Sequence, residues 1–159
     1  MFPNFQVIPI LEPADWQAGA KDMVSINMGK LHKVDILITL GAITGNDTSI
    51  IAYGGAAAGE KTTAIAFKYR LSGADQGAAG ADQFGDLSAA VVAATGLVFT
   101  DAADYSDRLI AIEISSDDMP AGLPWLTIAI DDGSASGLLL SAIGIGVPRY
   151  KANDVYTVI

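Results

Sequence analysis

The chain has 159 residues, a mass of 16.4 kDa and a net charge of −9, which fits one domain (residues 1–159) built around a single core. Nine lysines and arginines scattered along an acidic chain make no basic patch, so we expect neither a nucleic-acid partner nor binding to an anionic membrane. The chain has no cysteine, which excludes disulfides and thiolate chemistry, and its first residues lack the features of a signal peptide.

The acidic residues indicate the kind of secondary structure. Fifteen of the 18 are Asp and only three are Glu, and the chain also holds 17 glycines. Glu favours helices, whereas the short Asp side chain bonds the nearby backbone and favours turns and caps. The composition therefore predicts many strands joined by Asp- and Gly-rich turns.

Period-two alternation of apolar residues predicts strands along most of the chain. In chain order, the predicted strands are "QVIPIL", "DMVSINM", "VDILITL", "TSIIAY", "TTAIAFKYRL", "GLVFT", "RLIAIEIS", "PWLTIAID" and "LLLSAIGIGV". The predicted turns are "GAITGND", "GGAAAGE", "SSDDMPAG" and "DDGSASG". "PADWQAGAKD" is compatible with one helical turn, and "DLSAAVVAATG" with a helix, although we favour extended chain there. The pattern predicts an all-β fold, a mainly antiparallel β-sandwich or barrel-like domain with little helix.

Both ends of the chain are predicted to be extended arms. Residues 1–12 are apolar but interrupted by prolines, and residues 148–159 begin at Pro148 and finish in the β-prone "VYTVI". Between the central strands, residues 72–86 are rich in Ala, Gly and Asp and are predicted to form a long exposed loop. We expect the arms to supply contacts with another molecule, through the side chains of Phe2, Phe5, Val7, Ile8, Ile10, Trp16, Tyr150, Val155, Tyr156 and Ile159. The alternative is that the arms fold back onto their own domain.

The stretch "GGAAAGEKT" at 54–62 is close to the phosphate-binding loop of nucleotide hydrolases. In that loop a lysine directly follows the second glycine and a helix begins there, so that backbone N–H groups and the lysine converge on phosphate. Here Glu60 is inserted before Lys61, and the following residues alternate like a strand. We predict a hairpin loop with no nucleotide site.

The sequence indicates no catalytic site and no cofactor. "GIGVPR" at 144–149 lacks the rest of a dinucleotide fingerprint, and His32 is the one histidine, without a positioned nucleophile. Asp101, Asp104 and Asp107 leave calcium binding open as an alternative to solvated turn acids, but the spacing matches no EF-hand, so no metal is expected. Trp16, Trp125 and Tyr150 are compatible with a sugar site, although single aromatics in β-proteins more often belong to the core or an interface.

The order of features resembles small decoration (cement) proteins of tailed bacteriophages, which are encoded beside the major capsid gene. The resemblance covers roughly residues 9–147 and is carried by "PAD" at 13–15, "LGAITG" at 40–45 and "PWLTIAI" at 124–130. It implies a β-rich homotrimer on the outside of the capsid, with the major capsid protein as its partner and no catalysis. It also implies synthesis in the host cytoplasm before assembly. The tail "VPRYKANDVYTVI" lies beyond the matched pattern.

The expected function is therefore that of a non-enzymatic virion structural protein that stabilises a capsid. Two alternatives remain open: another particle component, such as a tail or fibre subunit, and a β-module that binds carbohydrate or calcium. An enzyme is disfavoured because the sequence offers no nucleophile–base pair.

Overall fold

The computed structural model describes residues 5–45 and 48–149, and for residues 16–19 and 132–136 it describes the backbone alone. Its strands are β1 (Gln6–Asp22), β2 (Ile26–Asn27), β3 (Leu31–Ile43), β4 (Thr48–Gly55), β5 (Thr63–Ile65), β6 (Lys68–Leu71), β7 (Leu97–Phe99), β8 (Leu109–Ser115) and β9 (Trp125–Pro148). Three 3-10 turns accompany them: η1 (Met28–Lys30), η2 (Ala102–Asp104) and η3 (Ser116–Asp118). Within the described residues every strand pair is antiparallel, which confirms the predicted fold class.

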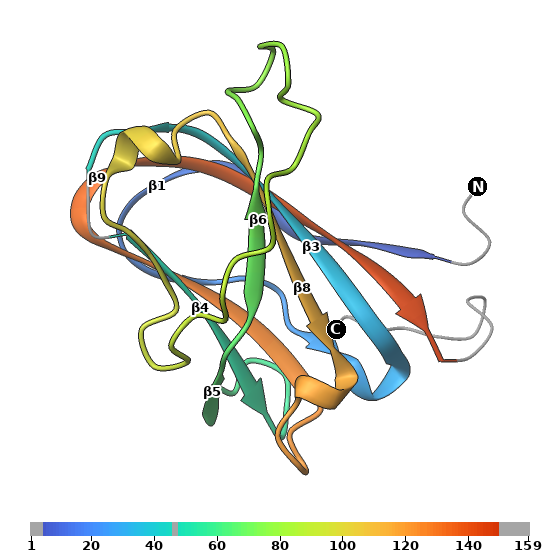
Figure 1. The fold of residues 1–159 in the computed structure, drawn as a ribbon. Coiled ribbons are helices and arrows are strands. Elements are labelled where there is room, and N and C mark those ends of the chain that lie inside the picture. The colour runs from blue at the N-terminus through green and yellow to red at the C-terminus, as the bar shows by residue number, and fades with distance from the viewer. Residues whose placement is uncertain (1–4, 46–47, 150–159) are drawn as a thin grey trace.

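The 24-residue strand β9 organises the fold, because it bends and takes part in two layers (Figure 1). Its first half pairs with β4, from Gly55 opposite Trp125 to Thr48 opposite Asp132. Its second half pairs with β3, which continues outward to β8 and β6. Along its other side β9 pairs with β1 in both halves. The two layers are thus joined by strands that pass from one to the other.

The core lies between the layers and follows the predicted alternation. On β3 the buried side chains are every second residue from Val34 to Leu40, and on β8 they are Ile110, Ile112 and Ile114. β4 and the first half of β9 contribute Ile50, Ile128 and Ile130 from the opposite layer. Because the side-chain period of a strand is two, this register places one face of each strand in the core and the other outside.

The long connection between β6 and β7 covers the outer edge of β6. Three backbone N–H groups, those of Gly85, Ser88 and Val91, donate to carbonyl oxygens of residues 71, 69 and 67 at 2.9 Å. Residues 85–91 therefore follow this edge without forming a helix, and they protect backbone groups that would otherwise be unpaired. The end of "DLSAAVVAATG" is neither helix nor extended chain, because the Thr95 and Gly96 N–H groups donate to the Val92 carbonyl in a turn.

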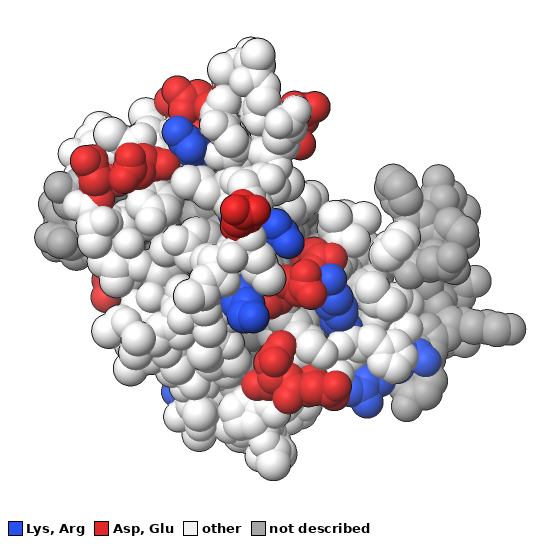
Figure 2. All heavy atoms as spheres, viewed as in Figure 1, with Lys and Arg blue, Asp and Glu red and all other residues white. Residues whose placement is uncertain are grey.

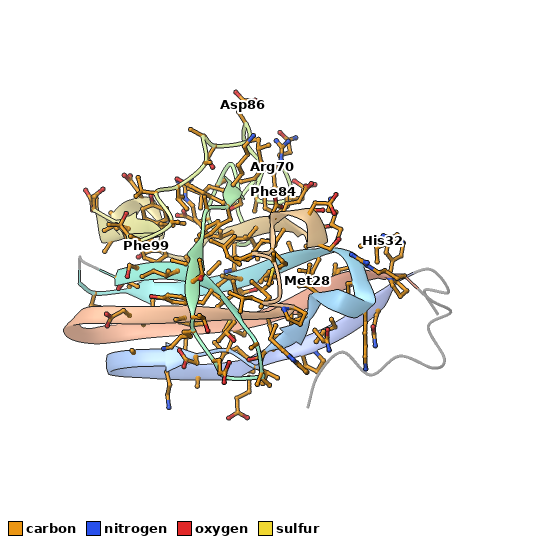
Figure 3. The ribbon with its side chains drawn as sticks, turned by 90° about the horizontal axis from the view of Figure 1, so that it is seen from below. Met28, His32, Arg70, Phe84, Asp86 and Phe99 are labelled. Atoms are coloured by element: carbon orange, nitrogen blue, oxygen red, sulfur yellow. The ribbon has the colours of Figure 1, made fainter. Side chains whose placement is uncertain are left out.

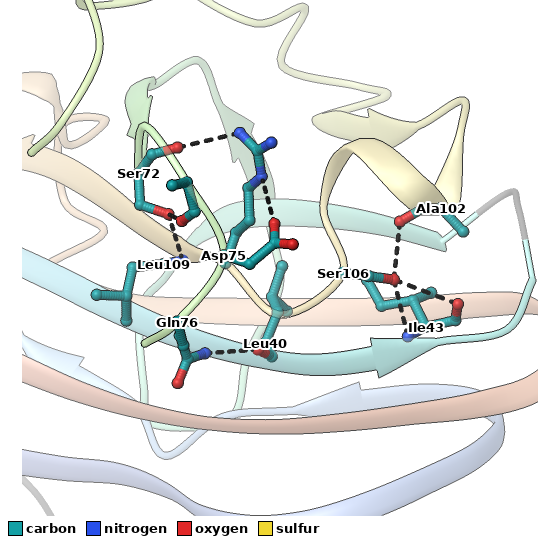
Figure 4. Close-up of polar contacts among 10 residues, drawn as sticks. Leu40, Ile43, Ser72, Asp75, Gln76, Ala102, Ser106 and Leu109 are labelled. Atoms are coloured by element: carbon teal, nitrogen blue, oxygen red, sulfur yellow. Dashed lines mark hydrogen bonds and ion pairs between the residues drawn. The ribbon is translucent and has the colours of Figure 1, made fainter. Parts of the chain in front are cut away.

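Polar contacts tie the base of this connection to the sheet (Figure 4). The Ser72 hydroxyl accepts from the Leu109 N–H at 3.1 Å, and the Arg108 guanidinium donates to the Ser72 carbonyl at 3.1 Å. Gln76 Nε2 donates to the Leu40 carbonyl at 2.7 Å, and Asp75 lies 3.5 Å from Arg108. Residues 72–76 are thereby fixed on the sheet, and Phe84 returns to pair with Ser72. Residues 77–82 project beyond the sheet (Figure 1).

Two local expectations are wrong for a common reason. The turn expected at "DDGSASG" lies inside β9, and the helical turn considered for "PADWQAGAKD" lies inside β1. These two segments are neighbours, with Gln17 opposite Gly137 and Gly19 opposite Asp132. Pairing of the residues on either side of 133–136 keeps both segments within their strands, and it overrides their local preference for turns.

Only part of the expected arms lies among the described residues. Residues 6–12 are extended, as predicted, but they belong to β1 and pair with β9 of the same domain. Residues 1–4 and 150–159 lie outside the described residues. No helix in the described part of the chain is long and apolar enough to cross a membrane.

Candidate interaction face

Between Ala142 and Gly146, β9 places its larger side chains outside the fold and its smaller ones inside, whereas the preceding Leu138 and Leu140 point into the core. Leu139 and Ile143 are 49% and 42% exposed, whereas Ala142, Gly144 and Gly146 face the core side. The glycines are needed there, because a Cβ on Gly146 would lie 3.0 Å from a methyl carbon of Leu31. Leu31 of β3 therefore packs closely over the small residues on this side of β9.

Neighbouring strands extend the exposed aliphatic surface on both sides of β9. On β1, Val7 is 52% exposed and lies opposite Ile145. On β3, the half-buried Leu37 lies opposite Ile143. Side chains at directly opposed positions of antiparallel strands lie on the same face of the sheet. Val7, Leu37, Leu139, Ile143 and Ile145 therefore form one surface, which we call the apolar face.

A groove of about 580 Å³ borders the apolar face where β1 forms the edge of the sheet. Its apolar lining includes Pro9, Leu11, Pro13, Val24 and Ile143, of which Val24 is 42% exposed, and the acidic Glu12 and Asp22 also line it. A proline has no N–H to donate, so two prolines on an edge strand oppose the addition of a further strand. The shape and chemistry of this region suit the packing of apolar side chains more than strand pairing.

Charged side chains of both signs stand beside the apolar face. Lys33 Nζ lies 3.0 Å from a carboxylate oxygen of Glu113 and 3.2 Å from one of Asp35. Burial, the largest single influence, lowers the pKa of Lys33, but hydrogen bonds and charge interactions with Glu113 and Asp35 outweigh it, so that the pKa is raised. Figure 2 shows acidic side chains in several separate groups, with lysines and arginines beside some of them. Such a mixed border favours orientation of a partner over general electrostatic attraction.

The predicted contact residues have different outcomes. Phe5 is 48% exposed and directly precedes β1, close in sequence to Val7. Ile8 and Ile10 are 2% and 1% exposed, so the expectation of a contact through these two is corrected: they alternate with Val7 and Pro9 and point into the core. Of Trp16 only the backbone is described, opposite Leu138. The remaining predicted contacts lie outside the described residues: Phe2, Tyr150, Val155, Tyr156 and Ile159.

The near phosphate-binding stretch is a hairpin loop between β4 and β5, as predicted. The Glu60 carboxylate accepts the N–H groups of Ala56 and Ala57, each at 3.1 Å, so it fills the position that a phosphate would need. Lys61 points elsewhere and pairs with Asp22 at 2.8 Å. The loop is closed by its own carboxylate, and it offers no anion site.

The remaining residues considered as metal-binding or catalytic candidates do not come together in a site among the described residues. Asp101 caps η2 by accepting the Ala103 N–H at 3.0 Å. Among the described residues no group of three or more His, Asp or Glu side chains is arranged to hold a metal ion. Figure 3 shows the exposed His32 at one edge of the molecule, away from Arg70, Phe84 and Asp86.

Sequence reasoning missed the part of the face that lies on β3 and β9. The residues it did not assign to a contact surface are Leu37, Leu139, Ile143 and Ile145. A signal was present, because in "AIGIG" at 142–146 one alternating face holds two isoleucines and the other holds only alanine and glycine. Which of the two faces the core depends on the neighbouring strands, and that information is not local.

Comparison of the chain with protein-family models, with curated proteins and with solved structures found no match. The apolar face and the groove beside it are therefore interpreted from their own geometry.

Proposed function

We propose that this chain is a non-enzymatic structural protein of a virus particle, which binds the outside of a tailed-phage capsid and stabilises it. One observation carries the proposal: β9 presents Leu139, Ile143 and Ile145 outward, and beside the two isoleucines only Ala142, Gly144 and Gly146 of this strand face the core. Large aliphatic side chains on an outer sheet face, continuous with exposed Val7, mark a surface that gains free energy when another protein covers it.

The resemblance to decoration proteins indicates the kind of partner. In this proposal the partner is the assembled major capsid protein, and the protein acts as a homo-oligomer, a trimer in the family that it resembles. A protein of this kind works by linkage: it binds the assembled shell more tightly than separated subunits, so its binding free energy adds to the stability of the shell.

The test uses capsids assembled from the major capsid protein of the genome that encodes this chain. We expect the purified protein to cosediment with assembled capsids and not with unassembled subunits. The melting temperature of the shells should rise with protein concentration, because a ligand stabilises the state that it binds by RT ln(1 + [L]/Kd). Absence from the capsid fraction, or equal binding to free subunits, would contradict the proposal.

A further inference from the structure

A second apolar groove lies at the end of the domain where the described chain finishes. It has a volume of about 400 Å³ and is formed by η1, η3 and the connection that leads into β9. Met28, Met119, Pro120, Leu123 and Pro124 line it. Two backbone hydrogen bonds define its shape: Leu123 N–H donates to the Pro120 carbonyl at 3.0 Å, and Met28 N–H donates to the Pro124 carbonyl at 2.8 Å. We call it the end groove.

Arg149, the last described residue, stands at the rim of the end groove and is held there by two hydrogen bonds. Its backbone N–H donates to the Lys30 carbonyl and its Nε donates to the Leu31 carbonyl, both at 2.9 Å. Arg149 also contributes to the groove lining. The described chain therefore ends beside the groove.

The sequence that follows has the chemistry to fill the groove. Residues 150–159 read "YKANDVYTVI", with two tyrosines, two valines and an isoleucine. Methionine thioethers pack favourably against aromatic rings, and flexible methionines adapt to the group that they contact. Ten residues of extended chain span up to about 33 Å, so the segment is long enough for any of these side chains to reach the groove.

We propose that residues 150–159 dock in the end groove of their own chain, with an aromatic side chain packed among Met28, Met119 and Leu123. The segment is tethered at the rim, so its effective concentration at the groove is in the millimolar range set by short linkers. A segment from a second copy would have to compete with this tethered segment for the same groove. The inference does not depend on the proposed function, since it concerns a different surface and only this chain.

Cysteine cross-linking in the full-length chain tests the docking directly, because the natural sequence contains no cysteine. Leu123→Cys is combined, one pair at a time, with a cysteine at position 151, 153, 155 or 157. Disulfides form only when the two Cβ atoms approach to about 4 Å, so we expect a cross-link within one chain for at least one pair. Val92→Cys with the same four partners is the matched control, since Val92 is 68% exposed on another part of the fold, and it should give none.

Electrophoresis without reductant separates the outcomes. A fast-migrating monomer that persists on dilution supports docking within the chain. A covalent dimer places the segment on a second copy and overturns the proposal, and the absence of a cross-link for all four pairs also overturns it.

Limited trypsin digestion gives a second readout that needs no cysteine. A docked segment is protected, so cleavage after Lys151 should be about tenfold slower in the natural protein than in Leu123→Asp, because proteolysis follows the population of the open form. Val92→Asp, an equivalent change away from the groove, should be cleaved at the natural rate. Circular dichroism confirms that each variant is folded, and equal cleavage rates for all three proteins would contradict the docking.

Discussion

At the residue scale, Gly96 shows how a single backbone position controls the attachment of β7 to β4. Its φ is +64°, its N–H donates to the Val92 carbonyl at 2.8 Å, and a Cβ at this position would collide with the Ile50 carbonyl. Left-handed backbone and the steric conflict both require glycine here. The contact with Ile50 of β4 comes from a partner far away in the chain, so the residues around Gly96 do not reveal it.

Gly96→Ala is therefore expected to destabilise the protein by about 2 kcal/mol or more, the cost of a strained backbone plus a displaced strand. Gly77→Ala is the matched control: its φ is +85°, but a Cβ there would meet no atom within 4 Å. That variant should lose only about 1 kcal/mol, the cost of the φ angle alone. Urea denaturation of the two variants measures the difference, and equal losses would contradict the close packing at Gly96.

Tyr105 predicts how stability changes in alkaline solution. Its ring stacks on Phe99 with centroids 4.3 Å apart, and burial, followed by the influence of Tyr69 and Asp104, raises its pKa to about 12. The ordinary value is 10.0, so between these two pH values the unfolded chain has lost a proton that the folded chain retains. Stability therefore falls as the pH rises through this window.

Tyr105→Phe removes the ionisable group and keeps the stacked ring. We expect the natural protein to lose more stability between pH 9.5 and pH 11.5 than the variant does, as measured by denaturation midpoints. Lys33, whose pKa is also raised, contributes equally to both proteins, so the difference between them reports on Tyr105. Parallel curves for the two proteins would show that the phenol is not held in its neutral form.

At the element scale, the alternation of apolar residues located most strands but did not show how far the longest ones extend. The strands β3, β4 and β8 appear where period-two patterns predict them. The long strands β1 and β9 were divided, because Asp- and Gly-rich segments within them resemble turns when only near neighbours are considered. Their mutual pairing, with register shifts such as that between Gln17 and Gly19, decides the outcome, and it joins residues more than 100 positions apart.

The same reasoning explains why the apolar face was only partly predicted. Val7 and Phe5 were selected from an apolar terminal segment, and both are exposed. Ile8 and Ile10 were selected by the same argument and are buried, because a strand directs successive side chains to opposite faces. Assignment of each residue to a face requires the register of β1 on β9, which composition does not contain.

Gly146→Val tests the packing across β9 and β3. The added side chain meets Leu31 at 3.0 Å and Ile8 at 3.4 Å from its Cβ alone, so we expect a loss of about 1–3 kcal/mol from overpacking. Ser141→Val places the same side chain on the outer side of the same strand and should change the free energy of unfolding by less than about 0.5 kcal/mol. Both values come from urea denaturation, and an equal effect of the two changes would contradict the assignment of the faces of β9.

At the scale of the whole molecule, the proposed function depends on whether a partner covers the apolar face. The fold class followed from the alternating pattern and the Asp- and Gly-rich composition, whereas the proposed function rests on a resemblance of pattern and on outward-facing aliphatic residues. Replacing Val7 and Ile143 by threonine removes apolar area from the face and should weaken binding to a partner. The domain should stay folded, because threonine keeps the β-branched shape that strands favour.

The most direct measurement compares two double variants for cosedimentation with assembled capsids. Val7→Thr/Ile143→Thr changes the apolar face, and Val92→Thr/Val98→Thr makes the same kind of change at exposed valines elsewhere. We expect the first to bind at least about tenfold more weakly than the natural protein, since two buried aliphatic contacts are lost, and the second to bind normally. Equal binding by both variants would show that the apolar face does not contact the capsid.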